Sequence, residues 1–262
     1  MSLKLMNAIP KLYFSPQFVG FDSVDYSRPA LWVGNHSRYG LLDIPLMLDH
    51  VQNNHDVLLH GLADKVHFKV PIWRDFLSSG GAVLGTPEEC SKLMQNEKHV
   101  LVFPGGAREV MRRRNEQYTL VWKKRLGFVR MALQHGYDII PFASLGPDES
   151  FDVLIDANDV INTPWWKQLN KIPSVNRATR NGDVIPPISK GIGLSIIPKP
   201  QRFYFSAGER ISLPKQKTFK DTDLWDIRNK VAANIMSQLG ELKTIRKDDR
   251  DQNWSQVRRF LT

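Results

Sequence analysis

The segment LWVGNHSRYGLLDIP, residues 31–45, begins as an apolar run and stops abruptly at Gly-Asn-His. The run starts at Ala30 after Pro29 and is short and partly β-branched or aromatic, which favours a buried strand over a helix. We therefore expect His36 where this strand leaves the sheet, a place where open α/β sheets bind ligands. An imidazole has an unperturbed pKa near ~6.5, so His36 can act as a general base near neutral pH. The alternative is a loop histidine that is hydrogen-bonded to the backbone.

A second apolar run, VLVFPGGARE at residues 100–109, reaches a proline and continues with two glycines and an arginine. Gly105 and Gly106 allow a sharp turn whose N–H groups can face a phosphate or a developing oxyanion. Arg108 adds a cationic fork that suits phosphate or carboxylate. The alternative is an ordinary strand-to-loop turn with a solvated arginine. Because both blocks follow apolar runs in this order, we interpret them as two parts of one active site.

These residues resemble the glycerolipid acyltransferase superfamily, also described as lysophospholipid acyltransferase-like. Its members carry Asn-His-(four residues)-Asp and, later in the chain, Phe-Pro-Glu-Gly-(Thr or Ser)-Arg. The resemblance covers about residues 20–145, and the stretches 118–128 and 139–142 are similar too. It is closest to the branch of diacylglycerol acyltransferase-like and plastid phytyl ester synthase-like proteins, in which Phe-Pro-Gly-Gly-Ala-Arg-Glu replaces the second block.

The resemblance implies an O-acyltransferase that moves a fatty acyl group from a thioester donor, acyl-CoA or acyl carrier protein, to a lipid alcohol. It implies that His36 is the general base, that Asp43 is its partner and that Arg108 contacts a substrate phosphate. The candidate substrate-binding residues are Asn35, Gly105, Gly106, Arg108 and Glu109. Backbone donors near Gly105 and Gly106, or near Asn35, would stabilise the oxyanion. We expect no acyl-enzyme and no cofactor beyond the thioester co-substrate.

The spacing between base and acid departs from the family pattern. Six residues separate His36 from Asp43, where the family has four. On a continuous helix the two residues would lie roughly 10 Å apart, too far for a hydrogen bond, so contact requires a loop, which Gly40 permits. The rival hypothesis is that Asp43 caps a helix that begins at Ile44, with Pro45 in its first turn. Both roles can coexist.

A second departure is Thr86, which stands where phosphate-accepting relatives carry an additional arginine. Pro87 then starts a helix predicted to end near Gln95. The missing cation favours a neutral acceptor, such as diacylglycerol or a long-chain alcohol, unless Arg74 reaches the same place. The alternatives are a lysophospholipid or glycerol-phosphate acyltransferase, a non-catalytic lipid-binding protein, and a lipid esterase that uses His36 with water.

Composition excludes several other classes of protein. With 262 residues, 42% hydrophobic and 24% charged, the chain can bury a core without disulfides, and its single cysteine, Cys90, cannot form an internal bridge. The histidines at 50, 55, 60 and 67 lack the spacing of metal ligands, so we expect no metal site. There is no phosphate-binding loop, no dinucleotide fingerprint and no pattern typical of nucleic-acid binding.

The charge of the chain predicts an anionic partner, because the formal net charge is +9 and the pI is near 9.6. Arginines at 112–114 and the Lys-Lys-Arg at 123–125, beside Trp122, suit an anionic membrane surface or CoA. No run approaches the ~18–20 apolar residues of a membrane-spanning helix, and the first residues lack the apolar core of a secretory signal. We therefore expect a cytoplasmic protein that is peripherally associated with a membrane.

The order of the expected elements predicts an α/β fold, a central mostly parallel sheet flanked by helices, in one acyltransferase-like domain at 1–243. Strands are expected near 30–34, 56–60, 99–103, 138–143 and 195–206, and helices near 44–52, 87–96, 122–135 and 223–242. The last helix would pack through Leu224, Ile227, Val231, Ile235 and Leu239. Residues 160–200 predict a lid or membrane-contact insertion, with a buried irregular core loop as the alternative. Residues 244–262 predict a charged tail.

Overall fold

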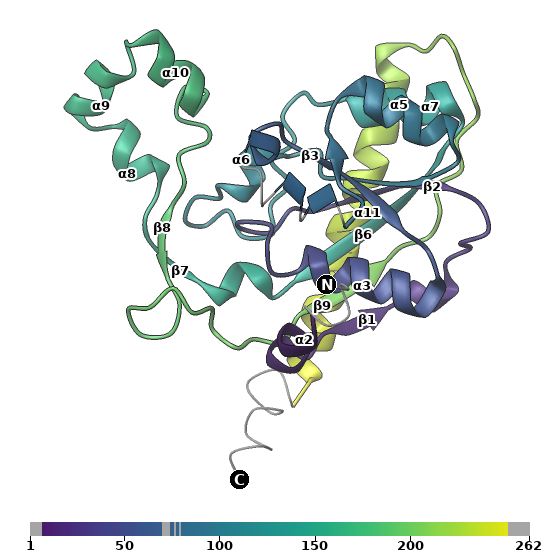
Figure 1. Ribbon diagram of the computed structural model, residues 1–262, viewed down its shortest axis with the longest axis horizontal. Helices are drawn as coiled ribbons and strands as arrows, with labels where there is room; N and C mark the ends of the chain where they lie inside the picture. Colours follow the sequence, from purple (N-terminus) through teal and green to yellow (C-terminus); the bar gives the residue numbers. More distant parts are fainter. Residues whose placement is uncertain (1–6, 70–73, 76, 79, 251–262) are drawn as a thin grey trace.

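The computed structural model describes residues 7–69, 74–75, 77–78 and 80–250. A seven-stranded sheet in the order β1-β9-β6-β2-β5-β3-β4 forms the centre of the molecule (Figure 1). Its strands are β1 (Gln17–Val19), β2 (Ala30–Gly34), β3 (Leu59–Ala63), β4 (Val83–Leu84), β5 (His99–Val102), β6 (Asp138–Leu145) and β9 (Tyr204–Ala207). All neighbouring pairs are parallel except β6 and β9. The predicted α/β class with a mostly parallel sheet is therefore confirmed.

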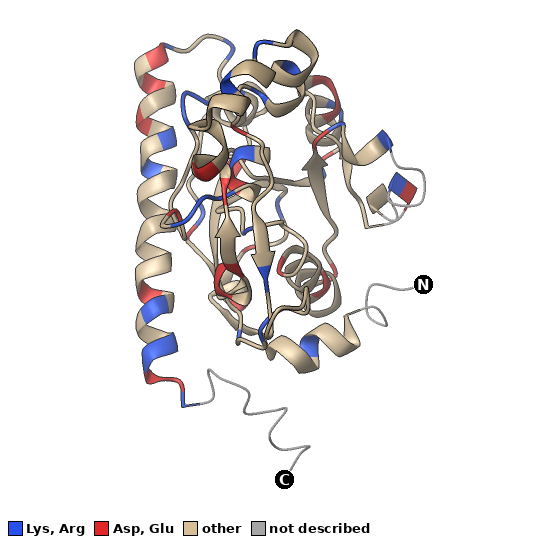
Figure 2. Cartoon of the chain, turned by 90° about the vertical axis from the view of Figure 1, so that its left-hand side faces the viewer, with Lys and Arg blue, Asp and Glu red and all other residues tan. Residues whose placement is uncertain are grey.

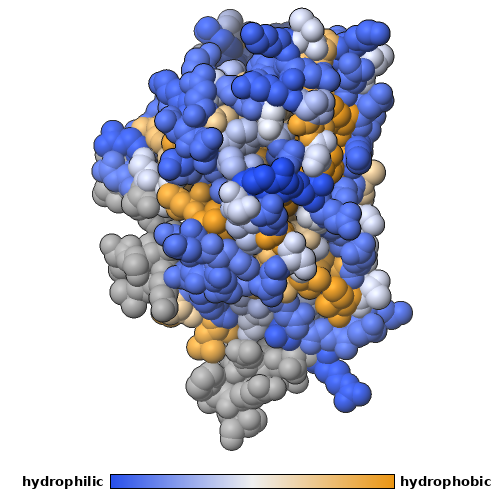
Figure 3. All heavy atoms as spheres, turned by 90° about the vertical axis from the view of Figure 1, so that its right-hand side faces the viewer, coloured by the Kyte–Doolittle hydropathy of each residue, from blue (hydrophilic) through white to orange (hydrophobic). Residues whose placement is uncertain are grey.

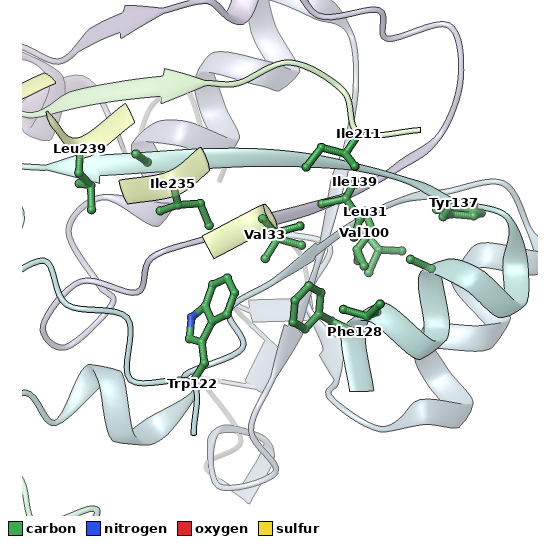
Figure 4. Packing of buried hydrophobic residues seen from close by; sticks show 14 of the residues in the cluster. Leu31, Val33, Val100, Trp122, Phe128, Tyr137, Ile139, Ile211, Ile235 and Leu239 are labelled. Carbon is green, nitrogen blue, oxygen red and sulfur yellow. The ribbon is translucent and has the colours of Figure 1, made fainter. Parts of the chain in front are cut away.

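Helices cover both faces of this sheet, and its central strands β2, β6 and β9 are buried along their whole length. The helices that pack on the sheet are α2 (Ala8–Phe14), α3 (Ile44–His55), α5 (Pro87–Gln95), α7 (Gly127–His135) and α11 (Asp221–Asp248). Consecutive side chains of a strand point to opposite faces. In β2, Leu31 and Val33 join the core cluster with α5, α7 and α11 (Figure 4), whereas Ala30 and Trp32 join the cluster with α2 and α3. The strand that delivers His36 is thus clamped between two cores.

The long helix α11 packs along one side of the molecule (Figure 2) through the predicted apolar face. Leu224, Val231, Ile235 and Leu239 are buried, and Ile227 is partly buried against the same cluster. The helix continues six residues past the predicted end at Leu242. Ile245 adds a further core contact and Arg246 pairs with Glu149 at 2.8 Å. The first residues of the predicted tail are therefore helical, and residues 251–262 lie outside the described part of the chain.

Two expected elements are shorter than predicted. The helix expected from Trp122 begins only at Gly127, because Lys123 has a left-handed φ of 47° and Trp122 turns into the core with no exposed surface. The strand expected over 195–206 is confined to β9. Pro198 and Pro200 lack the N–H groups that a ladder needs, which accounts for the late start.

Residues 152–200 form a lobe that stands apart from the sheet (Figure 1). A two-stranded ribbon of β7 (Asp152–Ile155) and β8 (Ile188–Lys190) leads to the short helices α8 (Ala157–Ile161), α9 (Pro164–Leu169) and α10 (Pro173–Thr179). Trp166 is buried within the lobe, but its neighbour Trp165 is 57% exposed. The alternative of a buried irregular core loop is therefore wrong for this segment.

Candidate active site

The two sequence blocks meet at the carboxyl end of the sheet. His36 follows β2 and Phe103 follows β5, and these strands are parallel neighbours. The His36 and Phe103 rings stack with centroids 4.2 Å apart and an interplanar angle of 22°. A short helix, α6 (Ala107–Val110), follows the two glycines, and its Val110 carbonyl accepts a hydrogen bond from the Tyr39 N–H in the loop after His36. The blocks thus form one site.

The backbone of His36, and not its ring, is held by hydrogen bonds. The His36 N–H donates to the Glu109 carboxylate at 3.3 Å, and its carbonyl accepts from two nitrogens of Arg112 at 3.1 and 2.6 Å. Within the described residues neither ring nitrogen has a hydrogen-bond partner, and Nδ1 is buried. The alternative of a ring that is tied to the backbone is therefore wrong, and the imidazole is available for chemistry.

Burial and charge keep this imidazole neutral. Burial lowers the pKa of His36 to about 3, and the positive charges of Arg112 and then His67 act in the same direction. At neutral pH the ring is therefore in the form that can accept a proton.

Asp43 makes no hydrogen bond to His36, and its carboxylate is held by two serines instead. Its buried carboxylate accepts hydrogen bonds from the Ser37 hydroxyl at 2.7 Å and the Ser144 hydroxyl at 2.9 Å. It occupies the N-cap position of α3, but its side chain accepts no helix N–H. Neither the direct pairing with His36 nor the predicted helix cap is present. Instead, Asp43 fastens the loop after His36 to β6.

That loop passes directly against the imidazole. Gly40 has a left-handed φ of 60°, and a Cβ at this position would overlap the Cε1 and Nδ1 of His36. The loop predicted from Gly40 is thus present, and the ring is held between Gly40 and Phe103. Packing, instead of a hydrogen bond to an acid, fixes the position of the His36 ring.

Two other predicted site residues are engaged by the protein itself. The Asn35 amide exchanges two hydrogen bonds of 2.9 Å with the Ser144 backbone. Glu109 is fully buried, and besides His36 it accepts the Val121 N–H at 2.8 Å. Burial raises the pKa of Glu109 to about 7. The direct substrate contacts predicted for Asn35 and Glu109 gain no support from this geometry, which gives both residues a positioning role.

Arg108 is also paired internally. Both of its Nη atoms donate to the Glu116 carboxylate, and the Asp183 carboxylate lies 3.8 Å from its Nε. The side chain is only 8% exposed. Its fork is therefore already filled by a carboxylate, and the predicted contact with a substrate phosphate gains no support. Arg74, the suggested substitute, is exposed and pairs with Asp75.

The sequence gives little sign of the role of Arg112. It was expected in a basic surface cluster, but its side chain is completely buried. Besides His36 it donates to the Glu116 and Thr119 carbonyls at 2.7 and 2.6 Å, and it lies 3.3 Å from the Asp148 carboxylate. The one available signal is its position three residues after Glu109, a spacing at which an acidic and a basic side chain can pair.

Thr86, which stands where phosphate-accepting relatives carry an additional arginine, has a structural role. Its hydroxyl accepts the Glu89 N–H at 3.3 Å and caps α5, which begins at Pro87 as predicted.

Among the described residues, no group of three or more His, Cys, Asp or Glu side chains could hold a metal ion. His50 stacks on Phe18 and His55 on Tyr26.

Comparisons with known proteins match this chain to one family. Residues 15–145, half of the chain, match the family described as Acyltransferase. The chain is 33% identical to phytyl ester synthase 1, chloroplastic, of Arabidopsis thaliana over 79% of its own length and 32% of that protein. It is 27% identical to diacylglycerol O-acyltransferase 2 of Dictyostelium discoideum over 64% of its length and 52% of that protein.

A solved structure shows the same fold. The 1-acyl-sn-glycerophosphate acyltransferase PlsC of Thermotoga maritima superposes with a TM-score of 0.54 at 16% identity, covering 90% of this chain and 78% of that chain. The chain spans about a third of the length of the plant relatives it matches. The family match, the two blocks and the fold lead to one conclusion, namely that this chain belongs to the acyltransferase family.

Proposed function

We propose that this protein transfers a fatty acyl group from a thioester donor, acyl-CoA or acyl carrier protein, to a neutral lipid alcohol. The observation that carries the proposal is the neutral imidazole of His36, whose nitrogens have no partner among the described residues and which lies beside the glycine turn. The names of the relatives, phytyl ester synthase and diacylglycerol O-acyltransferase, are consistent with ester formation on such acceptors.

In the proposed reaction His36 takes the proton of the acceptor hydroxyl as the oxygen attacks the thioester carbonyl. A C–O bond forms, the C–S bond breaks, and the proton passes from His36 to the departing thiolate. The Gly106 N–H already donates to the Phe103 carbonyl at 3.0 Å. Within the described residues the Gly105 N–H has no such partner, so it is the better donor for the oxyanion.

A neutral acceptor fits the charges around the site. Thr86 caps α5, and the guanidinium of Arg108 is hydrogen-bonded to the Glu116 carboxylate, so neither side chain is free for an acceptor phosphate. A lysophospholipid or glycerol-phosphate acyltransferase would need another cation for its acceptor. A lipid esterase would use the same base with water.

A transfer assay separates these functions. Purified protein is incubated with labelled acyl-CoA or acyl carrier protein and with diacylglycerol, phytol, lysophosphatidate or glycerol-3-phosphate. We expect labelled ester on the neutral alcohols. Ester only on the phosphate-bearing acceptors would overturn the acceptor assignment, and release of free fatty acid alone would indicate an esterase. Absence of turnover with every pair would favour the non-catalytic lipid-binding alternative.

The low pKa of His36 predicts an unusual pH profile. A histidine with a pKa near ~6.5 would be only about 3% neutral at pH 5, so kcat/KM would fall roughly thirtyfold from pH 8. With the pKa of His36 at about 3, the base stays neutral, and we expect less than about a twofold fall over this range. The measurement is kcat/KM between pH 5 and 8, with circular dichroism as the control for folding. Because the pKa of Glu109 is about 7, its own titration is removed with Glu109→Gln. An acid limb between pH 6 and 7 that persists in this variant would contradict the prediction.

We also propose that the lobe of residues 152–200 contacts an anionic membrane surface, where the lipid acceptor resides. Its loop exposes Leu194 by 89% and Ile196 by 86%, and α9 exposes Trp165. Six basic and four acidic residues accompany these apolar side chains. The face opposite the lobe is largely hydrophilic (Figure 3). In the described part of the chain no helix is both long and apolar enough to cross a bilayer.

The double substitution Leu194→Ser/Ile196→Ser tests the membrane contact. Each large aliphatic side chain contributes about 1.5–3 kcal/mol when buried, so partition onto vesicles with anionic lipid should fall at least tenfold. Met236→Ser, at an exposed methionine of α11, is the matched control. Vesicle flotation measures the bound fraction. Equal binding of the double variant and the control would remove the lobe from the membrane contact.

A further inference from the structure

A cavity of about 590 Å³ is lined in part by Phe103, whose ring stacks on that of His36. It is lined by the ends of β3 and β5, by the glycine turn and by the start of α7. We propose that this cavity binds the phosphate of the acyl donor, that is, the pantetheine-linked phosphate that CoA and acyl carrier protein share. The inference rests on the proposed function and deepens it, because it replaces Arg108 with a different phosphate site.

The charge of the cavity is strongly positive. Four cations, Lys124, Arg125, Arg130 and Arg180, and one carboxylate, Asp64, line it among the described residues. Arg180 and Asp64 form an ion pair at 2.6 Å, which leaves the other three cations without a carboxylate inside the cavity. Such a concentration of one sign attracts an anionic ligand.

The three remaining cations are available in different ways. Lys124 is exposed and forms no hydrogen bond or ion pair with the described residues. In the described part of the chain, the Arg130 side chain pairs only with the well-exposed Asp221, at 3.4 Å. Arg125 donates one Nη to the Pro104 carbonyl at 2.7 Å, which holds its guanidinium against Gly106. A side chain at Gly106 would occupy the place of this guanidinium, so the glycine lets the cation reach the turn.

The start of α7 adds backbone donors to these cations. Leu126 is the N-cap residue and makes no side-chain cap, so the N–H groups of the first turn are not satisfied by it. Leu126, Gly127 and Phe128 all line the cavity. No heavy atom lies within 4 Å of the place where a Cβ of Gly127 would be, so a ligand can approach the backbone. Uncapped amides and the helix dipole both favour a phosphate there.

The position of the cavity suits a donor with a charged head and a long arm. Phe103 lines the cavity, and its ring stacks on His36. A phosphate held by Lys124, Arg125 and Arg130 would therefore lie in a cavity that shares Phe103 with the proposed base. The pantetheine arm would cross the glycine turn and bring the thioester to His36.

Calorimetric titration of the full chain tests this site without any need for turnover. The probes are CoA, 4′-phosphopantetheine, pantetheine and glycerol-3-phosphate. The test variant is Lys124→Gln/Arg130→Gln. The control, Lys230→Gln/Lys247→Gln, removes two exposed lysines of α11 that do not line the cavity. We expect the test variant to bind CoA about tenfold more weakly than the wild type and the control to bind as the wild type does.

The probes separate the sources of the phosphate. If the test variant loses affinity for CoA and for 4′-phosphopantetheine equally, the cavity binds the phosphate that both share. If it loses more affinity for CoA, the other phosphates of CoA also bind there, which favours CoA over acyl carrier protein as the donor. Pantetheine has no phosphate, so both variants should bind it with the affinity of the wild type. Unchanged CoA affinity in the test variant would overturn the inference, as would a loss confined to glycerol-3-phosphate.

The same experiment keeps this inference apart from the proposed function. If the wild type transfers acyl groups but the test variant binds CoA normally, the cavity is not the donor site and the function stands. If CoA binding depends on Lys124 and Arg130 but no acceptor is acylated, the phosphate site stands and the transfer reaction does not.

Discussion

His36→Ala should abolish acyl transfer while leaving the protein folded. Removal of a general base typically lowers the rate by ~10²–10⁴. The ring makes no hydrogen bond with the described residues, and its main contact is the stack on Phe103. Loss of one such ring contact costs about 1 kcal/mol, so the melting temperature should change little. The measurement is kcat on the best acceptor, together with thermal unfolding of the same preparation.

The control for this result is His135→Ala. His135 lies on α7, and its Nε2 lies 3.0 Å from the Ser91 hydroxyl, remote in sequence from both blocks. We expect it to keep near-normal turnover. A His36→Ala protein that keeps wild-type turnover would remove His36 from the mechanism, and equal losses in both variants would point to a general effect on folding.

Arg112→Ala should give the largest loss of stability. It would remove the cation that lies between two buried carboxylates, Glu109 and Asp148, and it would leave the His36 carbonyl without its donors. Breaking a buried ion pair by removing one partner costs about 3–5 kcal/mol. Urea unfolding should therefore shift to a much lower midpoint, and turnover should fall because the backbone of His36 is released.

A neighbouring arginine provides the control. Arg113 makes an exposed hydrogen bond to Asn158, so Arg113→Ala should change the free energy of unfolding by less than about 1 kcal/mol. Arg112→Lys retains the charge but cannot reproduce the forked contacts, and we expect an intermediate stability. Equal stability of Arg112→Ala and Arg113→Ala would show that the buried network does not hold the site.

The location of the site could be predicted from the sequence because parallel strands bring their carboxyl ends to one edge. His36 and Phe103 follow two apolar runs, and the adjacency of β2 and β5 places them together. The partners of Asp43 could not be predicted, since Ser144 lies 101 residues away. The burial of Arg112 is equally invisible in the sequence, because three consecutive arginines are typical of a solvated surface.

The helices of the lobe illustrate a signal that could have been used. Pro164 and Pro173 each begin a helix, and Thr163 caps the first of these by accepting the Trp166 N–H. These helices have only 6 and 7 residues, so they show no apolar periodicity. Their local starts were readable from the sequence, but their separation from the sheet depends on tertiary packing.

The packing of the His36 ring between Gly40 and Phe103 has a consequence for which ring nitrogen carries the proton. A histidine that donates to a carboxylate has one preset tautomer, because the acid keeps a proton on the facing nitrogen. Here Asp43 accepts hydrogen bonds from Ser37 and Ser144, and within the described residues no acid is bonded to the His36 ring to select its tautomer. In the proposed reaction the arriving substrate would therefore select the nitrogen that receives the proton, and the shape of the pocket would orient the ring in place of a carboxylate.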